Sequence, residues 1–149
     1  MGTLTVPAQG DIYIDTQIII YSVQKHPVYA PLCLPLWYAA LVKPNRVFSS
    51  ELALMETTIL PIRNADTALQ TQFERFLLNS DVTLLPITAD VLRKAALLRA
   101  TIPALKTPDA LHAATALLHG CSLFLTNDAG FRRVPGLPLA LLDDILAAT

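Results

Sequence analysis

Hydrophobic positions alternate along the chain between short apolar runs and longer stretches with helical spacing. Short runs typical of buried strands lie at residues 12–14, 46–48, 82–87, 122–126 and 139–142. Helical spacing is found at residues 16–24, about 35–42, 51–60, 66–79, 88–99 and 108–119, and a short helix is expected at 129–133. Strands that alternate with helices form parallel sheets covered by helices. The pattern therefore predicts an α/β fold, a three-layer α/β/α arrangement with a central, mainly parallel sheet.

Prolines and glycines predict where several helices end. Pro44 and Asn45 are expected to end one helix, and Pro61 another. Gly120 is expected to end the helix that closes at His119. The 149 residues suit a single domain over residues 1–149, in which residues 1–10 are expected to form a flexible N-terminal extension.

Composition limits the classes of partner. Eleven basic and 12 acidic residues give a net charge of −1, so any contact with nucleic acid has to be local rather than spread over a basic surface. Hydrophobic residues make up 53% and charged residues 15%, against about 25% charged in an ordinary soluble domain. This excess predicts a buried partner interface, and Trp37 and Tyr38 on an apolar helix are the expected contacts.

The chain shows no sign of membrane insertion or export. Its longest uncharged windows, 26–42 and 110–127, contain prolines or His and Asn residues. Its first ten residues lack the basic and apolar regions of a secretory signal. Cys33 and Cys121 lie far apart without a metal-ligand spacing, as expected of reduced thiols. A cytoplasmic protein with no membrane association is expected.

Four acidic residues fall where open α/β sheets bind ligands, beyond the carboxyl ends of strands or at the starts of helices. Asp15 follows the first strand in IYIDT, and Asp128 follows the fourth in LFLTND. Asp109 begins a helix in TPDALHAATAL, whereas Glu56 lies on the apolar side of its helix. Each of two acids also has a structural alternative: Asp109 as a helix-start residue favoured by the helix dipole, and Asp128 as the cap of the short helix at 129–133.

Convergence of these carboxylates requires a cation. Like charges about 4 Å apart repel by roughly 4 kcal/mol at an effective dielectric near 20. Carboxylate ligands without thiolates or a histidine cluster favour Mg²⁺ or Mn²⁺, which commonly serve phosphate chemistry. The pattern therefore predicts hydrolysis of a phosphodiester bond at this site.

Four segments, in order along the chain, resemble the PIN-domain nucleases, particularly the VapC-type toxins of prokaryotic toxin–antitoxin pairs: IYIDTQIIIY, SSELALMET, TPDALHAATAL and LFLTNDAGF. The resemblance spans nearly the whole chain. It implies a PIN-like fold, cleavage of RNA with Mg²⁺ or Mn²⁺, and an antitoxin that blocks the cleft. Together with the apolar composition, it also favours a homodimer.

The resemblance assigns functional residues position by position. Metal binding and catalysis fall to Asp15, Glu56, Asp109 and Asp128. Supporting positions match Thr16, Thr126 and Asn127. One departure is Gln17, where Asn or a similar residue is usual after the first acid, and we interpret it as a change that tunes the metal site.

Other chemistry is possible at neighbouring residues. His112 and His119 share a helix face and His112 follows Asp109 by three, which permits a histidine acid/base pair or a zinc site, although a third ligand is missing. Arg132 and Arg133 follow Asp128 closely and are candidates for RNA contact or for a solvated surface. The alternative to an enzyme is a non-catalytic PIN-like module that acts through protein or RNA contacts.

Overall fold

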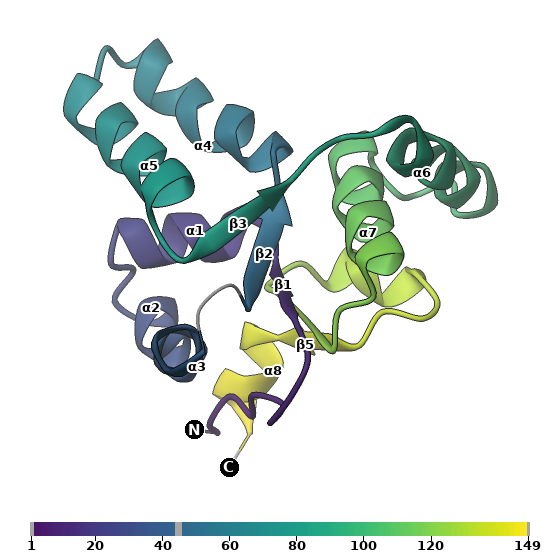
Figure 1. Cartoon of the computed structure of the whole chain (residues 1–149), viewed down its shortest axis with the longest axis horizontal. Helices are drawn as coiled ribbons and strands as arrows, with labels where there is room; N and C mark the ends of the chain where they lie inside the picture. Colours follow the sequence, from purple (N-terminus) through teal and green to yellow (C-terminus); the bar gives the residue numbers. More distant parts are fainter. Residues whose placement is uncertain (1, 44–45, 149) are drawn as a thin grey trace.

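The computed structural model describes residues 2–43 and 46–148, and its centre is a five-stranded sheet (Figure 1). The strands are β1 (Ile12–Ile14), β2 (Val47–Ser50), β3 (Val82–Leu85), β4 (Leu123–Thr126) and β5 (Leu139–Leu141). Their order in the sheet is β3-β2-β1-β4-β5, and every neighbouring pair is parallel. This confirms the predicted α/β fold.

Helices cover both faces of the sheet. They are α1 (Thr16–Val23), α2 (Tyr29–Leu32), α3 (Leu34–Val42), α4 (Leu52–Arg63), α5 (Thr67–Asn79), α6 (Ala89–Thr101), α7 (Thr107–His119), the 3₁₀ helix η1 (Ala129–Arg133) and α8 (Leu142–Ala147). One face packs on α1 to α5 and α8, and the other packs on α6, α7 and η1. Figure 1 shows α6 and α7 on the opposite side of the strands from α1 and α5.

The alternation of side chains along each strand builds these two cores. Ile12 and Ile14 belong to the core beneath α1 and α5, whereas Tyr13 between them belongs to the core beneath α7. Leu125 and Phe124 divide in the same way on β4. Because both faces are covered, these central strands are buried throughout, and their residues are apolar except for Thr126 at the end of β4.

Several element boundaries differ from the sequence prediction. Pro61 does not end α4, which continues to Arg63, because the proline ring is buried and its position near the helix end costs a single backbone hydrogen bond. Strand β3 stops at Leu85, two residues early. The short helices α2 and α8 were not predicted as separate elements. The predicted stop at Pro44 and Asn45 lies outside the described residues.

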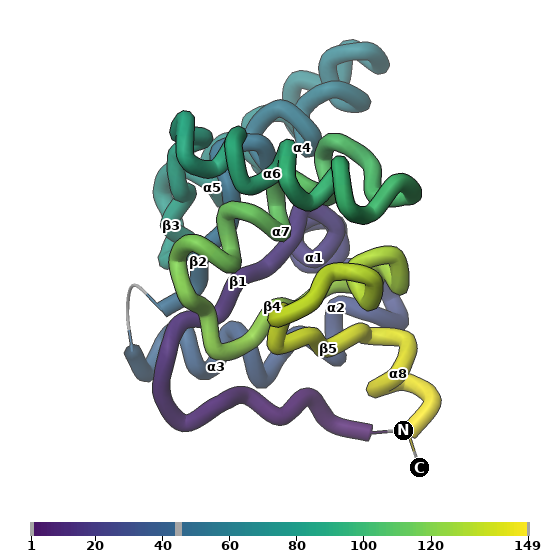
Figure 2. The backbone as a smooth tube through the Cα atoms, turned by 90° about the vertical axis from the view of Figure 1, so that its right-hand side faces the viewer, coloured from purple at the N-terminus to yellow at the C-terminus, as the bar shows by residue number. Residues whose placement is uncertain are grey.

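The N-terminal segment packs on the domain, whereas a flexible extension was expected. Leu4 is buried in the core, and the backbone N–H of Gly2 donates to the carbonyl of Ile145 in α8 at 2.9 Å. The buried Arg46 donates to the carbonyls of Gly10, at 2.6 Å, and Pro7. Figure 2 shows the segment running along one edge of the molecule toward α8. These contacts hold residues 2–10 in place.

No helix within residues 2–43 and 46–148 is both long enough and apolar enough to cross a membrane.

Candidate active-site cleft

The order of the strands brings the first and last predicted acids together. Strand β1 pairs with β4, so the residues after each strand leave the same edge of the sheet, and the N–H of Asp15 donates to the carbonyl of Leu125 at 3.3 Å. The chain turns to opposite sides of the sheet at this point, where open α/β sheets bind ligands.

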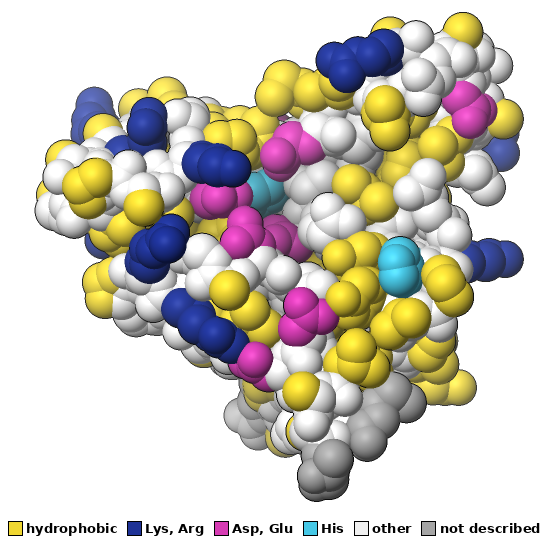
Figure 3. Space-filling model, turned by 180° about the vertical axis from the view of Figure 1, so that it is seen from behind, with side chains coloured by type: hydrophobic (Ala, Val, Ile, Leu, Met, Phe, Trp, Pro, Cys, Tyr) yellow, Lys and Arg dark blue, Asp and Glu magenta, His cyan; other side chains and the backbone are white. Residues whose placement is uncertain are grey.

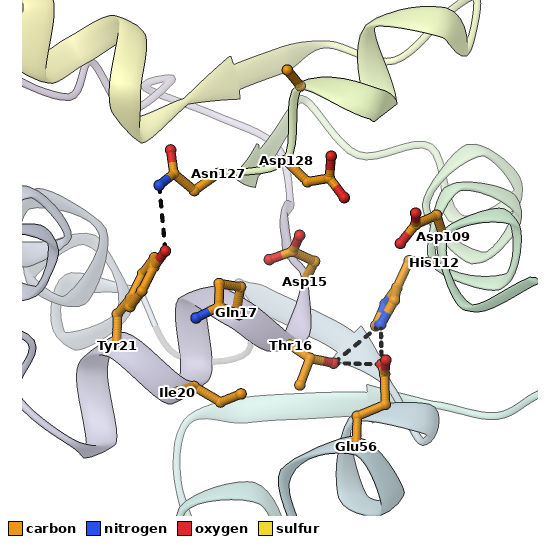
Figure 4. Close-up of a pocket in the computed structure, with 11 residues that line it drawn as sticks. Asp15, Thr16, Gln17, Ile20, Tyr21, Glu56, Asp109, His112, Asn127 and Asp128 are labelled. Carbon is orange, nitrogen blue, oxygen red and sulfur yellow. Dashed lines mark hydrogen bonds and ion pairs between the residues drawn. The ribbon is translucent and has the colours of Figure 1, made fainter. Parts of the chain in front are cut away.

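A cleft of about 430 Å³ opens there. It is lined by Asp15, Thr16, Gln17, Ile20, Tyr21, Glu56, Asp109, His112, Asn127, Asp128 and Ala129 (Figure 4). All four predicted acids therefore face one cavity, although their segments are spread over most of the chain. Figure 3 shows acidic side chains gathered around a hollow on this face, with a histidine inside it and basic side chains nearby.

Asp15 is the most buried of the four acids. It caps α1 by accepting a hydrogen bond from the N–H of Ile18 at 3.4 Å, and its Oδ2 accepts one from the hydroxyl of Thr126. Burial raises the pKa of Asp15 from 3.8 to about 6, and the bond from Thr126 and the charge of His112 offset part of that rise. A proton and a cation would therefore compete for this carboxylate near neutral pH.

Asp128 lies at the mouth of the cleft and caps η1, because its Oδ1 accepts from the N–H of Gly130 at 2.8 Å. The predicted capping role of Asp128 is thus confirmed. The capping bond uses Oδ1 of the carboxylate and not Oδ2. The hydroxyl of Thr126, which donates to Asp15, accepts from the N–H of Asp128 at 3.0 Å. Thr126 therefore fixes the spacing of the two acids.

Asn127 supports the cleft from the other side. Its Oδ1 accepts from the N–H of Asp143 at 2.8 Å, and its Nδ2 donates to the hydroxyl of Tyr21 at 3.3 Å. The ring of Tyr21 stacks on that of Tyr29, with centroids 4.6 Å apart. Asn127 thus holds an aromatic side chain at the uncharged end of the cleft.

Asp109 lies in the first turn of its helix, at the helix-start position that the sequence offered as a structural alternative. The N-cap of α7 is Lys106, and Asp109 lies in the first turn with its carboxylate toward the cleft (Figure 4). Burial, and then the charge of Asp128, raise the pKa of Asp109, while His112 and Lys106 act in the opposite direction. The carboxylate is therefore held close to another negative charge.

Glu56 is held by two donors on the same oxygen. Its Oε1 accepts from the hydroxyl of Thr16 at 2.7 Å and lies 2.8 Å from Nε2 of His112. Burial opposes ionisation, but the bonds from His112 and Thr16 outweigh it and lower the pKa of Glu56. Unlike Asp15, this carboxylate stays ionised well below neutral pH.

The structure does not bring His112 and His119 together, and it places Arg132 and Arg133 outside the cleft lining. His112 lines the cleft, but His119 lies outside it and pairs with Asp11 at 2.8 Å, so the two histidines do not form one site. Arg132 pairs with Asp144, and neither Arg132 nor Arg133 lines the cleft. Their contact with RNA stays a prediction.

Sequence reasoning missed the role of His112 as a neighbour of Glu56, and the role of Tyr21 in the cleft wall. The spacing of Asp109 and His112, about one helical turn, was a signal that both face the same side of α7. Tyr21 offered no signal, because its contact with Asn127 joins residues that are far apart in sequence.

The donors in the cleft fit a hard divalent cation. Asp15, Asp109 and Asp128 surround the same space in Figure 4, and their oxygens are the ligands that Mg²⁺ and Mn²⁺ prefer. No three His, Cys, Asp or Glu side chains of the described residues are close enough to ligate one ion together. This is compatible with Mg²⁺, which often binds through one or two carboxylates and keeps several waters.

Comparison with known proteins identifies the family. The model of the PIN domain matches residues 12–137. The chain belongs to the PIN-domain family. This confirms the resemblance seen in the four acidic segments. No curated protein sequence matches this PIN domain.

Solved structures share the fold of this PIN domain. VapBC2 from Rickettsia felis, crystallised with a DNA fragment from its promoter, is 25% identical, with a TM-score of 0.70 over 87% of this chain and 98% of that chain. A toxin–antitoxin complex from Klebsiella pneumoniae is 24% identical, with a TM-score of 0.66 over 89% and 98%. VapC20 from Mycobacterium tuberculosis, a toxin that cleaves the sarcin–ricin loop, is 22% identical, with a TM-score of 0.68 over 86% and 98%.

Proposed function

We propose that this PIN domain is a metal-dependent endoribonuclease and the toxin of a toxin–antitoxin pair. The observation that carries the proposal is the convergence of Asp15, Glu56, Asp109 and Asp128 on one cleft at the carboxyl edge of the sheet. The structures of similar fold include VapBC2 and VapC20, a toxin that cleaves the sarcin–ricin loop, and these support both parts of the proposal.

Asp15, Asp109 and Asp128 would hold Mg²⁺ or Mn²⁺. The ion would neutralise charge on a phosphodiester oxygen and favour deprotonation of an attacking water. Thr126 keeps Asp15 oriented and favours its ionised form, and Asp109 and Asp128 are pre-set as neighbours whose repulsion a cation relieves. Glu56, fixed through Oε1, is the carboxylate available to orient the water.

The uncharged end of the cleft suits a nucleotide base. Gln17, Ile20 and Tyr21 line it, away from Asp109 and Glu56 (Figure 4). Aromatic faces stack on bases with little dependence on sequence, and amides bond to base edges. We place the base next to the scissile phosphate against Tyr21.

Exposed apolar side chains support an antitoxin and a second copy of the chain as partners. On α3, Tyr38 and Val42 are 66% and 86% exposed, and α4 and α5 add further exposed apolar residues: Met55, Ile59, Leu60, Ile62 and Leu78. Trp37, expected at the interface, instead packs edge-on against Phe76 and donates to Ser22 at 3.1 Å. The proposed interface therefore uses Tyr38 and not Trp37.

The direct test is cleavage of RNA by purified protein freed of any partner. Structured RNAs and matched DNA are incubated in EDTA, Mg²⁺ and Mn²⁺. We expect cuts in RNA at discrete sites with either metal and none in EDTA. The variants Asp15→Ala and Asp109→Ala should fold and lose cleavage, whereas Asp90→Ala, an exposed acid paired with Arg93, should cut normally.

Equal cleavage by wild type and Asp15→Ala would remove the proposed site. If no nucleic acid is cut and calorimetry detects no metal binding, the alternative of a non-catalytic PIN-like module replaces the proposal.

A further inference from the structure

A buried chain of hydrogen bonds leads from the core to the cleft. The hydroxyl of Tyr13 on β1 lies 2.7 Å from Nδ1 of His112 on α7. On the other side of the ring, Nε2 of His112 lies 2.8 Å from Oε1 of Glu56 and 3.1 Å from the hydroxyl of Thr16. Tyr13 is fully buried and His112 is 2% exposed, so this chain is shielded from water up to Glu56.

The chemistry of these groups determines which ring nitrogen carries the proton. An ionised carboxylate is an acceptor only, so Nε2 facing Glu56 has to be the donor. In the neutral ring the other nitrogen, Nδ1, is then an acceptor, and the phenol of Tyr13 donates to it. The opposite tautomer would place a lone pair of Nε2 against the carboxylate at 2.8 Å.

The same chain determines which oxygen of Glu56 is available. His112 and Thr16 both bond to Oε1, and in the described part of the chain no hydrogen bond reaches Oε2. Glu56 lines the cleft, so its second oxygen is the one presented to it. The α4 backbone alone does not fix a glutamate, which has three rotatable side-chain bonds.

We propose that Tyr13 and His112 are positioning residues for this nuclease: Tyr13 donates to Nδ1 and so holds the ring of His112, and the Nε2–H of His112 turns the free oxygen of Glu56 toward the cleft. The inference rests on the proposed function for its consequence, the activity of Glu56, but the tautomer itself is a property of the folded chain without metal. Groups of this kind behind a ligand or base typically change activity or metal affinity by 10–100-fold when removed.

The first test reads the tautomer directly in metal-free protein. In the ¹⁵N spectrum of histidine-labelled protein, we expect Nε2 of His112 to carry a proton and Nδ1 to be the acceptor of the Tyr13 hydroxyl. In Tyr13→Phe the Nδ1 signal should shift because Nδ1 loses its hydrogen-bond donor, whereas the proton on Nε2 should remain. A proton on Nδ1 of the wild-type ring, in the neutral or charged form, overturns the proposal whether or not the protein cuts RNA.

The second test compares two amides at position 112. The amide nitrogen of glutamine can reach the place of Nε2, whereas that of asparagine matches Nδ1 and falls short of Glu56. We expect His112→Gln to keep at least ten times the kcat of His112→Asn, with similar KM for RNA and similar melting temperatures. Equal kcat in the two variants means that His112 only fills space, and it overturns the proposal.

A matched pair of tyrosines separates positioning from general stability. Tyr13→Phe removes the hydroxyl that faces His112, and Tyr29→Phe removes one that donates to Asp143 at 2.7 Å outside the cleft. We expect kcat to fall 10- to 100-fold in the first variant and to stay within twofold in the second. If wild type itself cuts no RNA, the proposed nuclease function fails. The measurement of the His112 tautomer in metal-free protein still tests the positioning proposal in that case.

Discussion

Thr126 donates its hydroxyl hydrogen bond to the buried carboxylate of Asp15 across the junction between β4 and β1. The two residues are 111 positions apart in sequence, and the pairing of Ile14 with Leu125 brings them together. The bond favours the ionised form of a carboxylate whose burial favours the protonated one. Thr126 therefore sets the pH range in which Asp15 can accept a cation.

The variant Thr126→Val tests this role with nearly unchanged volume. Loss of the donor should raise the pKa of Asp15 further, so the acidic limb of the pH–rate profile should move to higher pH. Thr126→Ser keeps the hydroxyl and should follow wild type. A profile of Thr126→Val that superimposes on wild type would contradict the assignment.

Asp15 should make stability depend on pH in an unusual direction. Its pKa is raised on folding from 3.8 to about 6, so the folded state binds this proton more tightly than the unfolded state. Ionisation of Asp15 therefore does not affect the free energy of unfolding below about pH 4. As pH rises through about 6, it lowers that free energy by an amount on the order of 3 kcal/mol. Asp15→Asn should remove that effect.

The measurement is urea unfolding of wild type and Asp15→Asn in EDTA at pH 4 and pH 7. The difference in unfolding free energy should shift in favour of the variant by up to about 3 kcal/mol at the higher pH. Because both proteins are compared at the same pH, the contributions of all other titrating groups to the unfolding free energy cancel. A difference that stays constant with pH would show that Asp15 has an ordinary pKa.

Metal should stabilise the fold through the acidic cleft. A ligand that binds only the folded state adds about 2.7 kcal/mol at a concentration 100 times its Kd. We expect Mn²⁺ to raise the melting temperature of wild type and of Asp90→Asn but not of Asp109→Asn. An equal rise in all three would place the bound metal elsewhere.

The N-terminal segment should depend on Arg46. Arg46→Met removes donors to the partly buried carbonyls of Pro7 and Gly10 and should lower the unfolding free energy by about 2–3 kcal/mol. Amide exchange should quicken at residues 2–10, while cleavage at 25 °C should stay within twofold. Arg63→Met, at an exposed position, is the control. An equal loss of unfolding free energy in both variants would show that Arg46 does not hold the N-terminal segment in place.

Tyr21 should affect substrate binding more than chemistry. Tyr21→Leu removes the ring and should raise KM for RNA about 5- to 150-fold, since stacking on one base contributes about 1–3 kcal/mol, with little change in kcat. Tyr21→Phe keeps the ring and should bind RNA nearly as well as wild type. An unchanged KM in Tyr21→Leu would contradict the placement of a base against Tyr21.

The sequence by itself determined the fold class and the four acids. Strands such as Leu123–Thr126, apolar except for the last residue, are typical of burial on both faces, and strands that alternate with helices favour a parallel sheet, so the sheet follows from local pattern. Asp15, Asp109 and Asp128 stood out because carboxylates at the ends of such strands and helices lie near the binding edge of the sheet.

The tertiary structure alone decided how those acids are held. The bonds from Thr126 to Asp15, from His112 to Glu56 and from Asn127 to Tyr21 join segments 56 to 111 residues apart, so no local spacing records them. Helix α4 likewise continues to Arg63 past the local stop signal of Pro61, which is buried in the folded chain. Local sequence patterns identify the functional residues. The packing of distant segments determines their hydrogen-bond partners, their charge states and which of their oxygen atoms face the cleft.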